Sequence, residues 1–123
     1  MKRYGRIAAV VVLVLVFGAA GLFKLVNAAA FREQFAHLGL PDWWIPVTGA
    51  VELLGAALIA LSKELPRQFG AAMLAATMAV ATALHLLHDP IALALPASAL
   101  LLLAAYVALI SRTAGAERRF AGA

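Results

Sequence analysis

Cysteine is absent from the 123-residue sequence, and charged residues supply only 13% of it. Without cysteine, the chain has no disulfide, thiol redox centre, thiolate zinc site or iron–sulfur cluster of its own. An ordinary soluble domain has about 25% charged residues. Because hydrophobic residues make up 65% of this chain, too few polar side chains remain to cover a surface that faces water. These shortages exclude a soluble globular enzyme and a disordered chain.

Long apolar runs take the place of a polar surface. They cover about residues 7–26, 44–61, 69–87 and 91–110. Each run is close to the ~20 residues that a helix needs to cross ~30 Å of hydrocarbon. No run alternates with period two, and the abundant alanine and leucine favour helices. We therefore predict an all-α fold: an integral membrane four-helix bundle that forms one domain over residues 1–123.

Most basic residues gather at one side of the predicted membrane. Only Lys24 and Arg32 lie on the other side. The charges mark the ends of apolar runs and form no patch, so they do not indicate nucleic-acid binding. The positive-inside rule therefore predicts a multi-pass protein with both termini in the cytoplasm. The eight residues on the cytoplasmic side are Lys2, Arg3, Arg6, Lys63, Arg67, Arg112, Arg118 and Arg119.

The first run has a second interpretation. Its basic start, its apolar stretch and the small residues after Asn27 also resemble a signal peptide with a cleavage site. However, the run is longer than the usual apolar core of about 7–15 residues, and it contains Lys24. We therefore expect an uncleaved transmembrane helix.

The connection between the first two runs is the longest one. Phe31, Phe35 and Leu38 recur at i, i+4 and i+7, with polar residues between them. This pattern predicts a short amphipathic helix at the outer membrane surface. Gly39 is expected to end that helix, and Asp42 to cap the next one.

Other residues mark the ends of the later helices. Trp43 and Trp44 are expected to hold the second helix at headgroup level. Asp89 is expected to cap the fourth helix, which would begin at Pro90. Pro96 lies inside the fourth apolar run, so we expect it to bend that helix.

Polar side chains inside the apolar runs are the candidate functional residues. Glu52 lies roughly 12 Å along its helix from the outer interface, at ~1.5 Å per residue. Its helical neighbours are small, so it should face the bundle, where a lone carboxylate is costly. Lys24 and His85 reach a similar depth on their own helices. We predict an intramembrane polar site of Lys24, Glu52 and His85, with His88 and Asp89 as a second tier.

Each of these residues also has a purely structural interpretation. Lys24 can extend its ammonium to the headgroups, and His88 can simply sit at the interface. Glu52 can pair with Lys24 and fix the helix register without any chemistry. Histidine pairs spaced like His85 and His88 are common, so they do not indicate a metal, and no residue is assigned a catalytic role.

Three segments of the chain resemble a known family. Together they are similar to the DoxX-like family of small four-helix bacterial membrane proteins. Lys24 and Glu52 fall on the charged positions of the family pattern, and Gly21 and Gly55 fall on its glycine positions. The segments are Gly21–Leu25, Phe35 followed by Leu38–Pro41, and Gly49–Ala56.

The resemblance implies a location and a range of functions. It implies a bacterial inner-membrane protein whose relatives include small partners of quinone-reducing thiosulfate oxidation and proteins of redox homeostasis. We expect an accessory or non-catalytic subunit without a covalently bound cofactor, which is not an enzyme by itself. Two alternatives stay open: a quinone-linked oxidoreductase subunit that uses Lys24, Glu52 or His85, and a small proton-coupled transporter that uses Glu52. The expected partners are the lipid bilayer, and either a redox protein or a second copy of the chain.

Overall fold

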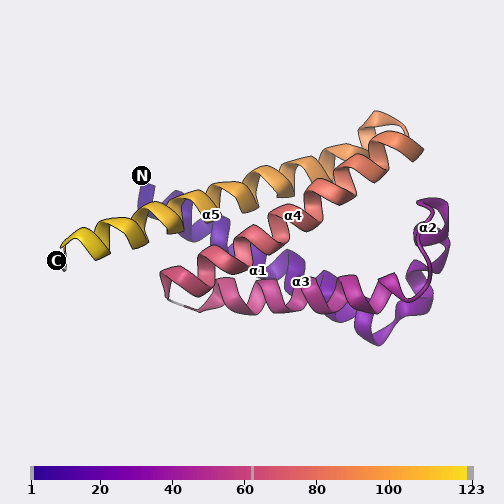
Figure 1. Ribbon diagram of the computed structural model, residues 1–123. Coiled ribbons are helices and arrows are strands. Elements are labelled where there is room, and N and C mark those ends of the chain that lie inside the picture. Colours follow the sequence, from indigo (N-terminus) through magenta and orange to yellow (C-terminus); the bar gives the residue numbers. More distant parts are fainter. Residues whose placement is uncertain (1, 62, 122–123) are drawn as a thin grey trace.

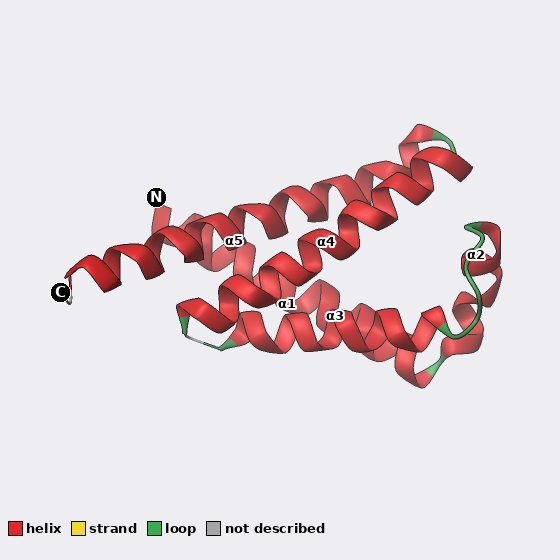
Figure 2. Cartoon of the chain, in the orientation of Figure 1, coloured by secondary structure: helices red, strands yellow, loops and turns green. Residues whose placement is uncertain are grey.

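The computed structural model describes residues 2–61 and 63–121, and this part of the chain contains helices and no strand (Figures 1 and 2). The predicted all-α class is therefore confirmed. In chain order the elements are α1 (Lys2–Val26), η1 (Ala28–Phe31, a 3₁₀ helix), α2 (Arg32–His37), α3 (Trp44–Ala60), α4 (Glu64–His88), η2 (Ile91–Ala94, also 3₁₀) and α5 (Leu95–Ala121).

The long helices pack in sequence. α1 packs against α3, α3 against α4, and α4 against α5, while α1 also touches α5. The two ends of the chain and the α3–α4 turn lie at one end of the molecule, which we call the terminal end (Figure 1). α2 and η2 lie at the opposite end, the α2 end. Toward the α2 end, the pair α1–α3 diverges from the pair α4–α5 (Figure 1).

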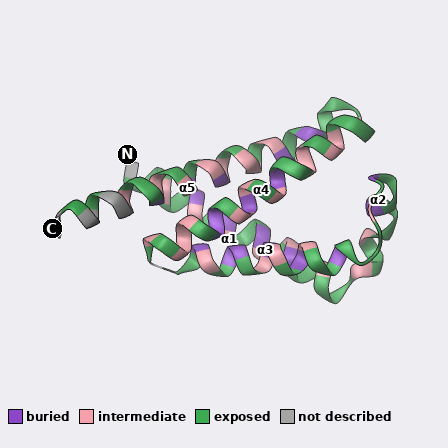
Figure 3. Cartoon of the chain, in the orientation of Figure 1, coloured by how far each residue is buried: buried purple, intermediate pink, exposed green. Residues whose placement is uncertain are grey.

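Three stretches are long and apolar enough to cross a membrane. They are Arg3–Val26, Glu64–His88 and Ile91–Ala114, with mean hydropathies of 2.6, 1.7 and 2.4. α3 is also apolar but has only 17 residues. Large apolar side chains such as Leu15 and Leu102 are exposed, and exposed positions recur along the long helices (Figure 3). Water disfavours such a surface and lipid does not, which fits a multi-pass membrane protein.

Glycines allow the helices to cross at close range. A Cβ atom on Gly21 of α1 would lie 2.6 Å from the carbonyl oxygen of Gly49 on α3. A Cβ atom on Gly70 of α4 would lie 2.7 Å from the carbonyl oxygen of Gly55 on α3. In lipid, helices associate through such close backbone packing rather than through hydrophobic exclusion. α3 is therefore held on both sides, by α1 and by α4.

The first long connection contains the short helix that the sequence predicts. The apolar side chains of Phe35 and Leu38 are both 7% exposed, so they face the protein. Gly39 has a φ of +79°, which is the left-handed conformation typical of a residue that ends a helix. The predicted cap at Asp42 is wrong, because Trp43 is the N-cap residue of α3 and makes no side-chain capping bond.

The boundaries of the last two long helices differ from the predicted runs. α4 begins at Glu64 rather than near residue 69, and Pro66 lies in its first turn, where its missing N–H needs no partner. The segment Ile91–Ala94 is 3₁₀, and α5 then begins at Leu95. Pro96 therefore also lies in a first turn and does not bend a continuous α-helix. The predicted cap at Asp89 is wrong too, because Pro90 is the N-cap residue of η2.

Candidate functional site

Lys24 and Glu52 form an ion pair between α1 and α3. The Lys24 Nζ lies 2.6 Å from Oε1 of Glu52, and the two side chains are 14% and 2% exposed. Each residue follows a glycine of the α1–α3 crossing by three positions, and each packs against the glycine of the other helix, which brings the two side chains together. The ammonium also lies 5.6 Å from the ring centroid of Phe31, within the range of a cation–π interaction. The predicted pairing of Lys24 with Glu52 is confirmed.

The second carboxylate oxygen of Glu52 lacks a partner. Oε2 is buried and accepts no hydrogen bond from the described residues. A buried acceptor without a donor is rare in native proteins and destabilising, which makes it a marker for a bound water, ion or ligand.

A cavity of about 490 Å³ lies beside this ion pair at the α2 end. It extends between α3 and α4, where the two helix pairs diverge, and residues of α1, η1 and α2 also line it. Most of its wall is apolar. Lys24, Gln34, Thr48, Glu52, Thr77 and His85 supply the polar groups. The apolar groups come from Phe31, Phe35, Leu38, Leu40, Trp44, Val47, Val51, Ala76, Met78, Val80, Ala81 and Leu84.

The three residues of the predicted polar site thus share one cavity. Lys24 comes from α1, Glu52 from α3 and His85 from α4, and all three line its wall. The cavity exists because Gly55 and Gly70 bring α3 and α4 together nearer the terminal end, and the helices then separate. Residues that are far apart in the sequence meet here because each lies at a similar height on its helix.

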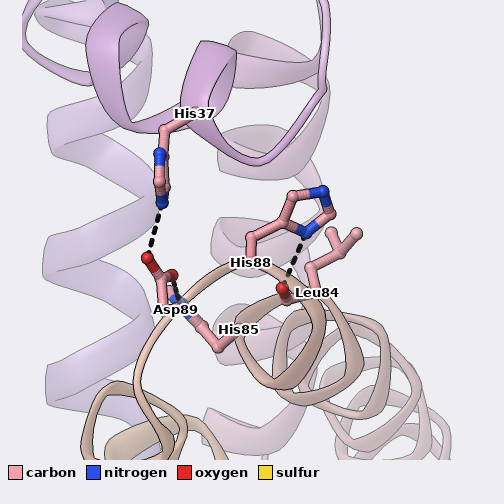
Figure 4. A network of polar contacts seen from close by, with 5 residues as sticks. All are labelled: His37, Leu84, His85, His88 and Asp89. Carbon is pink, nitrogen blue, oxygen red and sulfur yellow. Dashed lines mark hydrogen bonds and ion pairs between the residues drawn. The ribbon is translucent and has the colours of Figure 1, made fainter.

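Asp89 connects α2 to α4 across the edge of this region (Figure 4). Its Oδ1 lies 2.6 Å from Nε2 of His37, and its Oδ2 lies 2.7 Å from Nδ1 of His85. The hydrogen bond from His85 lowers the pKa of Asp89 below its ordinary value of 3.8; partial burial opposes this, and the bond from His37 adds to the lowering. Asp89 therefore acts as an ionised acceptor that holds α2 against the end of α4.

His88, which the sequence predicts as a second-tier site residue, forms its hydrogen bond within its own helix. Its Nδ1 donates to the carbonyl oxygen of Leu84, one turn earlier on α4, and the residue is exposed (Figure 4). It lies near His37, with the ring centroids 6.5 Å apart, but it does not line the cavity. The sequence did not single out His37 as a partner of Asp89. Its place on the polar side of the short helix was the one available signal.

Metal binding finds no support in the described part of the chain. No group of three or more histidine, aspartate or glutamate side chains is arranged there to hold a metal ion. The ring nitrogens of His37 and His85 that face Asp89 are each engaged by one of its oxygens.

The sequence also matches a known protein family. The model of the DoxX-like family matches residues 8–107, which include α3 and α4 in whole, most of α1, about half of α5 and every residue of the cavity wall. No curated protein and no solved structure matches the chain. Because the match covers most of its length, the chain belongs to the DoxX-like family.

Proposed function

We propose that this DoxX-like protein is an accessory membrane subunit that binds a lipid-soluble quinone in the cavity between α3 and α4. The observation that carries the proposal is the Lys24–Glu52 ion pair in the wall of a largely apolar cavity of about 490 Å³. Ligand sites in proteins commonly combine an apolar lining with a few convergent polar groups. A quinone has the matching chemistry, because it joins an apolar ring and tail to two carbonyl oxygens.

Lys24 fits one carbonyl of such a head group. An ammonium has three N–H donors, and among the described residues Lys24 uses one of them, on Glu52. A remaining donor can bind a quinone carbonyl, while the apolar side chains of Val47, Val51 and Val80 pack against the ring and tail. A bound quinone would supply two-electron redox capacity, and the residues of this chain would orient it and hold protons near its oxygens.

The accessory role follows from the composition of the chain. Because it contains no cysteine, it has no thiol or thiolate-bound redox centre of its own to exchange electrons with the quinone. A partner that carries such a centre would have to dock on the membrane subunit. We therefore propose a redox protein as the partner, and the alternative partner is a second copy of this chain.

We further propose that α3 is a fourth membrane span and that both termini lie in the cytoplasm of a bacterium. At ~1.5 Å per residue, the 17 residues of α3 extend about 26 Å, slightly less than ~30 Å of hydrocarbon. The stacked rings of Trp43 and Trp44, with centroids 4.9 Å apart, can anchor its start among headgroups. The excess of lysine and arginine at the terminal end supports the orientation. Reporter fusions near Lys63 should report cytoplasm, and fusions near His37 the outside.

Purification from the native membrane tests the quinone site directly. The protein is extracted in mild detergent, and mass spectrometry then identifies bound lipids and co-purifying proteins. We expect an endogenous quinone at near-stoichiometric amount with the unchanged chain. Ala81→Leu should remove it, because Ala81 lines the cavity and the three added carbons take space that the ligand needs. Ala83→Leu is the matched control, since Ala83 is an exposed residue of the same helix outside the wall. Equal quinone in both variants, or none in the unchanged protein, would contradict the proposed function.

A further inference from the structure

We infer that the cavity binds its ligand preferentially in the reduced, hydroxyl-bearing form, because Glu52 offers an acceptor that only a hydrogen-bond donor can satisfy. The inference rests on the proposed quinone site and states which member of the quinone–quinol couple that site prefers. A quinone head group has carbonyl oxygens, which only accept. Its quinol has two O–H groups, which donate.

The acceptor is Oε2 of Glu52. The side chain is 2% exposed, its Oε1 is engaged by Lys24, and Oε2 is buried without a partner among the described residues. Glu52 lines the cavity, and no described residue donates a hydrogen bond to this oxygen. Any ligand that brings an O–H group to it gains a charge-assisted hydrogen bond, which is about twice as strong as a neutral one.

The hydroxyl groups nearby on the cavity wall are already engaged. Thr48 donates to the carbonyl oxygen of Trp44 at 2.6 Å, and Thr77 donates to that of Met73 at 2.9 Å. Each hydroxyl has a single proton to give, so neither can serve Glu52 without breaking its existing bond. These two hydroxyls are therefore not free to donate to Oε2, and a molecule that enters the cavity can supply the donor.

His85 lines the same cavity from α4 but is already engaged. Its Nδ1 lies 2.7 Å from Oδ2 of Asp89, and an ionised carboxylate only accepts, so this nitrogen donates to Asp89. Oε2 of Glu52 is therefore the acceptor that this inference assigns to a ligand hydroxyl.

The test compares three ligands of nearly the same shape: decylhydroquinone, its dimethyl ether and decylbenzoquinone. The dimethyl ether keeps the ring and tail but has no donor and no redox activity under the assay conditions. The full chain is placed in nanodiscs without oxygen, and binding is measured by calorimetry. We expect the hydroquinone to bind at least about tenfold more tightly than the ether, because one charge-assisted hydrogen bond is lost.

Glu52→Gln should abolish this preference. The amide oxygen would face the Lys24 ammonium, since the amide NH₂ is repelled by it, and so the NH₂ group would occupy the place of Oε2. A donor in that place can bond an oxygen of any of the three head groups, so the hydroquinone loses its advantage. Glu33→Gln is the matched control, because Glu33 is an exposed residue of α2 outside the cavity wall, and it should keep the original order.

Different outcomes separate this inference from the proposed function. If the benzoquinone and the ether bind as tightly as the hydroquinone, a water molecule satisfies Glu52, and the inference is overturned while the quinone site stands. If none of the three ligands binds, both are overturned. If Glu52→Gln fails to fold, the ratio of affinities in the unchanged protein still decides the inference.

Discussion

Removing Lys24 should destabilise the protein more than neutralising Glu52, although the two residues form one ion pair. The reason is their unequal burial, since the side chain of Glu52 is 2% exposed and that of Lys24 is 14% exposed. Without Lys24, Glu52 becomes a buried carboxylate with no partner on either oxygen. Without the charge of Glu52, the ammonium keeps some solvent access and its contact with the Phe31 ring at 5.6 Å.

The magnitudes follow from this difference. Breaking a well-buried ion pair by removing one partner costs about 3–5 kcal/mol. We expect about 3 kcal/mol for Lys24→Met, at the lower limit, because the lysine lies near the edge of the protein. For Glu52→Gln we expect about 1–2 kcal/mol, because the amide oxygen still accepts a hydrogen bond from the ammonium.

The double variant Lys24→Met with Glu52→Gln should cost less than the two single changes together. It leaves no unpaired charge at the α1–α3 crossing, and so we expect a coupling free energy of about 1–2 kcal/mol. Asp42→Asn is the control for loss of an ion pair as such. Its partner Arg32 lies 3.8 Å away, and both side chains are more than half exposed, so its loss should change stability by less than about 0.5 kcal/mol.

Reversible unfolding in mixed detergent micelles, followed by tryptophan fluorescence, measures all four variants. The reasoning is refuted by strictly additive effects of the two single changes, which would mean that the residues do not interact. It is equally refuted if Glu52→Gln lowers the free energy of unfolding more than Lys24→Met does, since burial would then not determine the loss of stability.

Two further predictions concern the helix crossing and the attachment of α2. Gly21→Ala should lower the free energy of unfolding by about 1–3 kcal/mol in the same assay, because its Cβ would lie 2.6 Å from a backbone oxygen of α3. Gly18→Ala is the control and should change stability little, because nothing lies within 4 Å of its Cβ position. Equal effects of the two changes would contradict the close crossing. The pKa of Asp89 is lowered in the folded protein, so its stabilising contribution is complete above the ordinary value of 3.8 and is lost as the pH falls through the lowered value. Hydrogen-exchange protection of α2 should therefore persist from neutral pH down to about pH 3.8 and decrease below it. Asp89→Asn should reduce this protection above about pH 3.8 and make no difference once Asp89 is protonated. An unchanged α2 in that variant at neutral pH would show that the bond to His37 does not hold the helix.

Much of the fold follows from patterns that the sequence displays directly. The apolar runs predict the long helices because lipid requires every backbone polar group to be satisfied within the chain. The ion pair of Lys24 and Glu52 is predictable because a membrane protein tolerates a buried charge mainly beside an opposite one. Their helix positions, counted from the ends of the runs, are enough to bring them to the same height.

Other features depend on information that periodicity does not carry. The contact of His37 with Asp89 depends on the path of the chain between residues 38 and 43, where no repeating pattern fixes the direction. The 3₁₀ turn before α5 depends on Pro96, whose ring excludes an α-helical turn before it, although residues 91–110 form one apolar run. The cavity depends on the pairing of Gly55 with Gly70, because only that contact determines where α3 and α4 begin to separate.

Quenching of Trp44 by decylbenzoquinone tests the central claim, a quinone site in the α3–α4 cavity, most directly. Trp44 lines the cavity, and Trp43→Phe leaves it as the single tryptophan, since the chain contains two. In nanodiscs, the account predicts saturable quenching at about one quinone per chain, which Ala81→Leu abolishes and Ala83→Leu preserves. Quenching that rises linearly with quinone in the bilayer and is the same in both variants would contradict it.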